Sequence, residues 1–186
     1  DELPVNIKVF IEGEEEIGSP TMALFIEQNR EALEADVIII ADSGNVKIGV
    51  PTITTTLRGL VDGIIEVDQP MRPIHSGVGG GVVPDAFMVL SRIISSFHDD
   101  KGNLMIEGLT STDMKVTELE ESFLKKMLGS DDITLFDTES ISKRLWLEPA
   151  LDVLAIDAPP VKEAVNLVIP KARAKVSLRL PPTEDP

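Results

Sequence analysis

Two long stretches of two-residue alternation constrain the fold of this 186-residue chain more than any other feature. In residues 53–67, apolar or small side chains occupy every second position and polar or charged side chains occupy most of the others. Residues 172–180 repeat the pattern, and residues 151–156 are a third, shorter candidate. Because successive side chains of a strand point to opposite faces, the alternation predicts antiparallel strands with one covered face and one wet face.

Two amphipathic helices are predicted between these strands. The first runs from about Pro84 to Phe97 and carries an apolar face. The second opens with Thr117-Glu118-Leu119-Glu120, a capping-box pattern, and ends near Gly129. Antiparallel strands with two such helices predict an α+β domain over residues 51–181.

Residues 1–50 have a different, α/β pattern. Residues 5–11 predict a buried strand, Ser19-Pro20 predicts the cap and first turn of a helix that runs to about Glu34, and residues 37–41 form a β-branched run. Such a run is typical of a parallel strand covered on both faces. The result is a strand–helix–strand unit with carboxylates beyond the carboxyl ends of both strands, the edge at which open α/β sheets bind ligands.

Composition excludes several classes of partner and site. The formal net charge of −15 excludes a nucleic-acid partner, because a phosphate backbone would be repelled. The absence of cysteine excludes disulfides and thiolate zinc sites. No run approaches the ~20 apolar residues of a membrane span, and we expect a cytoplasmic protein without a membrane partner. The chain begins without Met and ends in a proline-rich tail, so we expect an internal piece of a longer protein.

The acidic segment Glu12-Gly13-Glu14-Glu15-Glu16 is the most informative for function. Four carboxylates within five residues repel one another unless a cation or solvent relieves them. One interpretation is a solvated turn before a helix N-terminus, where the helix dipole favours negative charge. The other is a cation site, because Asp42 ends the neighbouring predicted strand and paired strands lie ~4.8 Å apart. Two adjacent glutamates could then divide the work, one coordinating the metal and the other accepting a proton from water.

The pattern Glu-Gly-x-Glu-Glu-x-Gly-Ser at a strand-to-helix turn resembles the signature of the two-zinc exopeptidases and deacylases. That family includes carnosinase, aminoacylase, glutamate carboxypeptidase and succinyl-diaminopimelate desuccinylase. The resemblance implies that Glu15 is the general base and Glu16 a zinc ligand. It also implies that Asp42, within Ile-Ile-Ala-Asp-Ser-Gly-Asn, is a second zinc ligand.

The resemblance also implies the domain organisation. Residues 1–50 would be part of a zinc-exopeptidase-like α/β catalytic domain, and residues 51–181 an α+β lid and dimerisation domain. Residues 182–186 would be a linker back to a catalytic segment that this sequence lacks.

Three further segments resemble the lid of that family. His75-Ser76-Gly77, followed by three consecutive glycines, resembles the loop whose histidine crosses into the partner's active site in family dimers and polarises the scissile carbonyl. A surface loop histidine is the alternative. The segments around Asn166 and Arg179 resemble the substrate-binding segments, in which the arginine grips a terminal carboxylate through bidentate hydrogen bonds. An exposed strand residue is the alternative for Arg179.

The resemblance implies a metal-dependent hydrolase that cleaves the peptide bond of dipeptides or short peptides, with two zinc ions and a homodimer formed through the lid. Lys101-Gly102-Asn103 and Trp146-x-x-Pro149 favour the carnosinase-like branch. A deacylase or desuccinylase of N-acyl amino acids, or a non-catalytic dimerisation module of the same fold, are the alternatives. The family's His-x-Asp pair, bridging aspartate and final histidine are missing from these 186 residues. This chain alone is therefore predicted to be inactive and to bind zinc incompletely.

Overall fold

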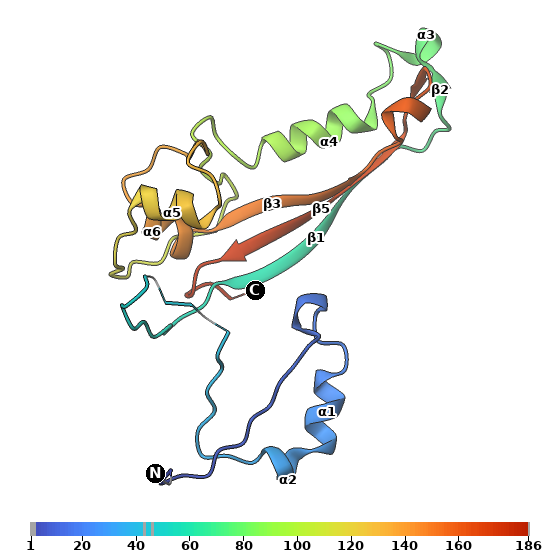
Figure 1. Cartoon of the computed structure of the whole chain (residues 1–186). Coiled ribbons are helices and arrows are strands. Elements are labelled where there is room, and N and C mark those ends of the chain that lie inside the picture. Colours follow the sequence, from blue (N-terminus) through green and yellow to red (C-terminus); the bar gives the residue numbers. More distant parts are fainter. Residues whose placement is uncertain (1–2, 43, 46, 186) are drawn as a thin grey trace. The chain divides into compact units, whose positions relative to one another are not determined.

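The computed structural model describes residues 3–42, 44–45 and 47–185 (Figure 1). The chain divides into two compact units, Asp1–Ile53 and Thr54–Pro186, and each is described by itself. Among the described residues, no helix combines the length and apolar character that a bilayer crossing requires.

A three-stranded antiparallel sheet forms the centre of the second unit. Its strands are β1 (Gly59–Asp68), β5 (Lys171–Leu180) and β3 (Ala150–Asp157), in the order β1–β5–β3. β1 and β5 pair over their whole length, and β3 carries a bulge next to Val153. The predicted antiparallel sheet is confirmed, with β5 at its centre.

Helix α4 (Ala86–Ser95) packs on one face of this sheet, over β1 and β5. Ala86 and Leu90 of the helix are buried against Ala172 and Ala174 of β5, and apolar residues of β1 pack around them. The small alanine side chains let the helix approach the strand closely. Asp85 caps the helix, because its Oδ1 accepts a hydrogen bond from the backbone N–H of Met88 at 3.1 Å. The first predicted helix is therefore confirmed, with slightly shorter ends.

The other face of the sheet is charged, as the alternation predicts. Cations of β5 alternate with Ala172, Ala174 and Val176 and pair with acids of the two flanking strands. The pairs are Lys171 with Glu66 at 3.1 Å and Asp68 at 3.2 Å, Lys175 with Asp62 at 3.1 Å, and Arg173 with Asp157. Hydrogen bonds from Lys175 and Ser177 hold the pKa of Asp62 below its ordinary value.

A small two-stranded sheet extends one end of this long ribbon (Figure 1). It pairs β2 (Ile74–His75) with β4 (Leu167–Val168), and the short helix α3 (Ser76–Gly79) follows β2 directly. The Gln69 N–H donates to the Pro170 carbonyl at 3.0 Å, so this end begins where the β1–β5 ladder stops. We call β2, β4 and α3 the tip of the second unit.

The remaining helices of this unit are α5 (Glu121–Met127), α6 (Ile141–Trp146) and the 3-10 turn η2 (Val161–Glu163). The capping box predicted for α5 is wrong, because Glu120 is its N-cap residue and makes no side-chain capping bond. Glu118 instead accepts hydrogen bonds from the Ser140 hydroxyl at 2.5 Å and the Ser142 N–H at 3.2 Å, at the start of α6. Helix α6 was not predicted from the sequence.

The first unit contains η1 (Glu15–Ile17), α1 (Met22–Gln28) and α2 (Arg30–Leu33). The helical region is confirmed, but it is divided into two helices and begins after Thr21 rather than at Ser19-Pro20. Phe10 stacks on Phe25 with ring centroids 5.1 Å apart, and this contact holds the first segment beside α1.

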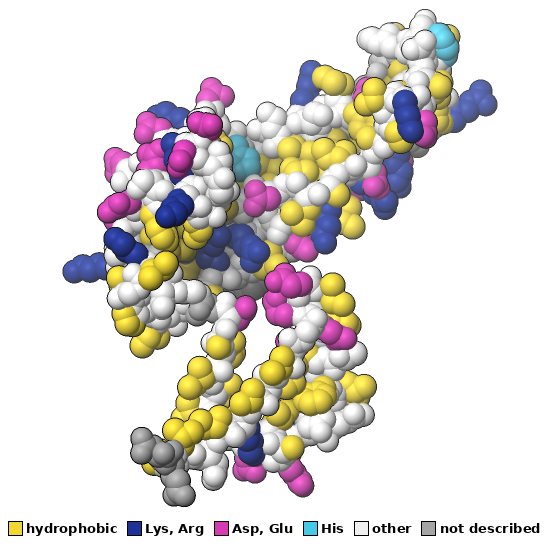
Figure 2. All heavy atoms as spheres, in the orientation of Figure 1, with side chains coloured by type: hydrophobic (Ala, Val, Ile, Leu, Met, Phe, Trp, Pro, Cys, Tyr) yellow, Lys and Arg dark blue, Asp and Glu magenta, His cyan; other side chains and the backbone are white. Residues whose placement is uncertain are grey.

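The strands predicted at residues 5–11 and 37–41 are not formed in this structure. Their apolar side chains are largely exposed, with Val9 at 79% and Ile39 at 85%, and Figure 2 shows such side chains along the visible surface of this unit. A buried parallel strand needs hydrogen-bonded neighbours and a covering layer. The described residues of the first unit supply neither for these two segments.

Candidate functional site

The acidic turn of the first unit folds as a single 3-10 turn that carries Glu15 and Glu16. Gly18 ends it in the left-handed conformation at φ 84°, where a glycine avoids the strain that a Cβ would bring. Its N–H donates to the Glu15 carbonyl at 2.9 Å, which closes the turn. Both glutamate side chains are exposed and make no hydrogen bond or ion pair with a described residue.

The two other carboxylates of this segment have different environments. Glu14 is bonded to Thr21, the residue before α1, since its Oε2 accepts from the Thr21 hydroxyl at 2.5 Å and from the Thr21 N–H at 3.3 Å. Glu12 is half-buried, and its Oε1 accepts no hydrogen bond from the described part of the chain. Glu15 and Glu16 are therefore the pair of this turn that is open to an external ligand.

The predicted metal site is incomplete within the described residues. Asp42 is exposed, like Glu16. Across residues 3–42, 44–45 and 47–185 no group of three or more histidine or carboxylate side chains could hold a metal ion. A zinc ion takes four ligands, so the described residues alone do not fit it.

His75 occupies the tip of the second unit. Its side chain is exposed, and its Nδ1 accepts a hydrogen bond from the Gly77 N–H at 3.0 Å, so the imidazole caps α3. The pairing of β2 with β4 sets His75 opposite Leu167, and the Ser76 N–H donates to the Asn166 carbonyl at 2.9 Å. The structure therefore places Asn166 beside His75.

Arg179 lies on the charged face of the sheet, opposite Leu60 of β1 and Ala150 of β3. It is exposed and forms no ion pair with a described residue, in contrast to Arg173 of the same strand. Arg58 is half-buried nearby, and burial together with the charge of Arg179 lowers its pKa, while Asp152 opposes the shift. This end of the face therefore carries two guanidinium groups near one carboxylate.

The candidate residues of the second unit lie at opposite ends of β5. His75 and Asn166 belong to the tip, which adjoins Lys171, whereas Arg179 is eight residues further along the strand. At ~3.3 Å per residue, the strand between Lys171 and Arg179 measures roughly 26 Å. The family resemblance assigned both Asn166 and Arg179 to substrate binding. The strand register places the two residues at opposite ends of β5.

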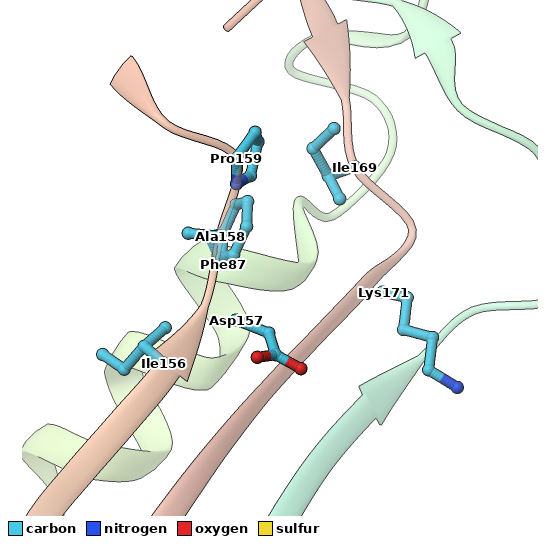
Figure 3. Close-up of a pocket in the computed structure, with 7 residues that line it drawn as sticks. All are labelled: Phe87, Ile156, Asp157, Ala158, Pro159, Ile169 and Lys171. Atoms are coloured by element: carbon cyan, nitrogen blue, oxygen red, sulfur yellow. The ribbon is translucent and has the colours of Figure 1, made fainter. Parts of the chain in front are cut away.

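An open hollow beside the end of β3 was not predicted (Figure 3). Apolar side chains from β3, from the residues that follow it and from α4 form most of its lining, which comprises Phe87, Ile156, Asp157, Ala158, Pro159, Ile169 and Lys171. The Asp157 carboxylate is engaged by Arg173. None of the candidate catalytic, metal-binding or substrate-binding residues lines this hollow.

Comparison with known proteins gives consistent results for sequence and structure. Residues 55–186 match the peptidase dimerisation domain. A cysteinylglycine-S-conjugate dipeptidase of Corynebacterium striatum is 39% identical over 182 residues, which are 95% of this chain and 40% of that protein. A Beta-Ala-His dipeptidase of Homo sapiens is 30% identical over 194 residues, 97% of this chain and 38% of the relative.

Two solved structures are similar to this chain. The crystal structure of human carnosine dipeptidase 1 superposes with a TM-score of 0.71 at 27% identity, over 99% of this chain and 42% of that one. A metallo-carboxypeptidase from Sulfolobus solfataricus gives a TM-score of 0.69 at 30% identity, over 94% of this chain and 42% of that one. The chain thus spans about two fifths of the length of the relatives it matches.

Proposed function

This chain belongs to the peptidase dimerisation domain family, and from this premise we propose that it is part of a metal-dependent enzyme that hydrolyses the peptide bond of dipeptides or short peptides. Support comes from the relatives, which include a cysteinylglycine-S-conjugate dipeptidase, Beta-Ala-His dipeptidases and a Cys-Gly metallodipeptidase of Saccharomyces cerevisiae. Two zinc ions per active site and a cytoplasmic location are part of the proposal.

The carboxylates of the first unit supply the proton transfer and part of the metal site in this proposal. Glu16 and Asp42 would hold zinc together with ligands from outside these residues. Bound zinc would supply Lewis-acid activation of the attacking water and of the scissile carbonyl. Glu15 would accept a proton from that water at its carboxylate and deliver it to the leaving amine nitrogen. The exposure of Glu15 and Glu16 and the engagement of Glu14 by Thr21 support this assignment.

The second unit would supply substrate contacts and the dimer. Arg179, whose guanidinium is unpaired among the described residues, suits the terminal carboxylate of a peptide. β5 lies in the centre of the sheet, so the edges that could pair with a second chain are the outer sides of β1 and β3. An edge exposes unpaired backbone donors and acceptors, which a second copy can satisfy.

The position of His75 relative to Arg179 is the observation that carries the proposal of a shared active site. The two residues lie at opposite ends of β5, roughly 26 Å apart along the strand. A dipeptide is at most ~7 Å long and cannot contact both residues of one chain. We therefore propose that His75, accompanied by Asn166, reaches the active site of the partner chain and binds the developing oxyanion there.

A mixture of two variants of the full-length enzyme tests this arrangement. Each homodimer, His75→Ala or Glu15→Ala, should be nearly inactive, because losing one oxyanion donor typically costs ~10²–10³ in turnover. A heterodimer would contain one site with an intact Glu15 and an intact His75 from the other chain. Activity that returns on mixing supports action in trans. If subunit exchange is demonstrated and no activity returns, the shared site is wrong.

A deacylase or desuccinylase of N-acyl amino acids is the second candidate, because an unpaired Arg179 suits the carboxylate of those substrates equally well. Turnover of dipeptides compared with N-acyl amino acids by the full-length enzyme separates the two activities. Turnover of neither by a zinc-loaded enzyme would favour a non-catalytic dimerisation module.

A further inference from the structure

The loop at the tip of the second unit determines which nitrogen of the His75 imidazole can carry a proton. The backbone N–H of Gly77 donates to Nδ1 at 3.0 Å. A nitrogen that accepts a hydrogen bond bears no proton, and a neutral imidazole has one donor nitrogen and one acceptor nitrogen. From this geometry we infer that Gly77 is a positioning residue, which fixes the proton of the neutral imidazole on Nε2.

The space around Gly77 couples this residue to the imidazole. A Cβ at position 77 would lie 3.0 Å from Nδ1 and 3.1 Å from Cε1 of His75, which is tighter than ordinary van der Waals contact. A side chain at this position therefore displaces the ring from the N–H that it accepts. Glycine is the residue that permits the Gly77 N–H and the imidazole to approach each other.

The backbone of the loop is held by its own hydrogen bond. The Gly80 N–H donates to the Ser76 carbonyl at 2.8 Å, and a Cβ on Gly80 would lie 2.4 Å from that same oxygen. Gly79 is buried, and a Cβ there would lie 2.7 Å from the Ile74 side chain. Since the loop backbone is held by this hydrogen bond and the His75 side chain is exposed, a substitution at Gly77 moves the imidazole rather than the loop.

With its proton on Nε2, the His75 imidazole presents that N–H as a hydrogen-bond donor. Nε2 of His75 donates to no described residue, and the side chain is exposed, so the donor is available to an external oxygen. This inference rests on the proposed function only where it names the developing oxyanion of the substrate as the acceptor for this N–H. A developing oxyanion is stabilised by a preorganised donor, and an acceptor nitrogen at the same place would repel it.

Nitrogen NMR of the chain with ¹⁵N-labelled histidine rings tests the inference directly. The chain contains two histidines, and the His98→Gln variant assigns their signals. In alkaline buffer, where histidine rings are neutral, we expect His75 to be a single tautomer with the proton on Nε2 and a hydrogen-bonded Nδ1. A ring that carries its proton on Nδ1, or an even mixture of tautomers in the wild-type chain, would overturn the inference.

Two glycine variants provide a matched comparison. Gly77→Ala should abolish the signature of the Nδ1 acceptor and introduce the second tautomer at His75, with the His98 signals unchanged. Gly63→Ala, whose Cβ would meet Val176 at an ordinary 3.7 Å, should leave both rings as in the wild type. A Gly77→Ala spectrum identical to the wild type contradicts the positioning role. These results do not depend on the mixing experiment, whose failure would reject action in trans and leave the tautomer assignment intact.

Discussion

At the scale of single residues, Arg179 and Arg173 differ in their partners although they share one strand and one face. Arg173 is paired with Asp157, whereas Arg179 has no ion pair among the described residues. In the full-length enzyme, Arg179→Lys should raise KM for dipeptides at least roughly tenfold, since a hydrogen bond to a charged group contributes ~1.5–3 kcal/mol. Lysine cannot reproduce the bidentate geometry of arginine. Steady-state kinetics measures the change.

The matched control is Arg173→Lys, which should leave KM near the wild-type value. Equal effects of the two variants would indicate that the charged face acts as a whole. No effect of Arg179→Lys would support the interpretation of Arg179 as an exposed strand residue.

The sequence allowed a role to be predicted for a single residue only where a motif aligned that residue with a known position. Charge alone could not separate Glu14 from Glu15, because the Thr21 partner of Glu14 is seven residues away and becomes its neighbour only after the turn has formed. The hydrogen bond between Gly77 and His75 was equally hidden, since His75-Ser76-Gly77 in sequence does not reveal which ring nitrogen faces the backbone. Such details depend on local backbone geometry, which residue identity does not specify.

At the scale of elements, Ser142 joins α6 to the residues before α5. Its side chain is buried, and its hydroxyl oxygen accepts a hydrogen bond from the Leu119 N–H at 2.7 Å. Ser142→Ala leaves that buried N–H without a partner and should lower the free energy of unfolding by ~1–3 kcal/mol. Urea unfolding measures the loss.

Ser130→Ala is the control for this prediction. Ser130 accepts a hydrogen bond from the Asp132 N–H at 3.2 Å in an exposed turn, so its removal should change the free energy of unfolding far less. Equal losses for both variants would show that Ser142 has no special part in fixing α6.

The charged face of the sheet predicts a specific pH dependence. Hydrogen bonds from Lys175 and Ser177 lower the folded-state pKa of Asp62 from its ordinary value of 3.8. A group with a depressed folded-state pKa contributes stability that is present above its unfolded-state pKa and is lost as pH falls through its folded-state pKa. The contribution of Asp62 should therefore be constant from neutral pH down to about pH 4 and disappear below it. Asp62→Asn should remove this part of the acid dependence. Thermal unfolding across pH 2–7 would then show unfolding midpoints of the variant and the wild type that differ at neutral pH and converge at low pH.

The helices and strands that were predicted correctly are those whose own residues show a clear period of apolar and polar side chains. β1 and β5 each show alternating burial along most of their length, and α4 has one apolar face, so their periodicity shows in the sequence. α6 has only six residues, too few to establish a helical period. The strands predicted at residues 5–11 and 37–41 were inferred from apolar content, whereas a strand also needs a hydrogen-bonded neighbour, which the described chain does not give them.

At the scale of the whole molecule, the metal content of this chain is a direct test of how many ligands it holds. The expected ligands are Glu16 and Asp42, and the described residues contain no cluster of three. Since zinc takes four ligands, dialysis against a weak chelator should leave well below one zinc per chain, measured by atomic absorption. Glu16→Gln should lower the residual binding further, whereas Glu14→Gln should not. Two tightly held zinc ions per chain would show that the ligands have been assigned wrongly.

The buried hydrophobic core of the described chain lies in one of its two units. Every buried hydrophobic residue of the described chain lies between Ala86 and Leu180, in the second unit. Because burial of apolar surface is the main stabilising contribution, cooperative unfolding should be a property of residues 54–186. A protein comprising only these residues should keep the unfolding midpoint of the whole chain. It should also sediment as a dimer in analytical ultracentrifugation, since the dimerisation domain matches residues 55–186. Residues 1–53 alone should show no cooperative transition.

Hydrogen exchange in the intact chain tests the same difference between the units. The amide protons of β5 should exchange slowly and those of residues 5–11 and 37–41 rapidly, because open segments without hydrogen-bonded partners exchange without global unfolding. A marked fall of the midpoint on removing residues 1–53, or slow exchange in residues 37–41, would show that the first unit is stabilised by burial in solution and that the core extends beyond the second unit.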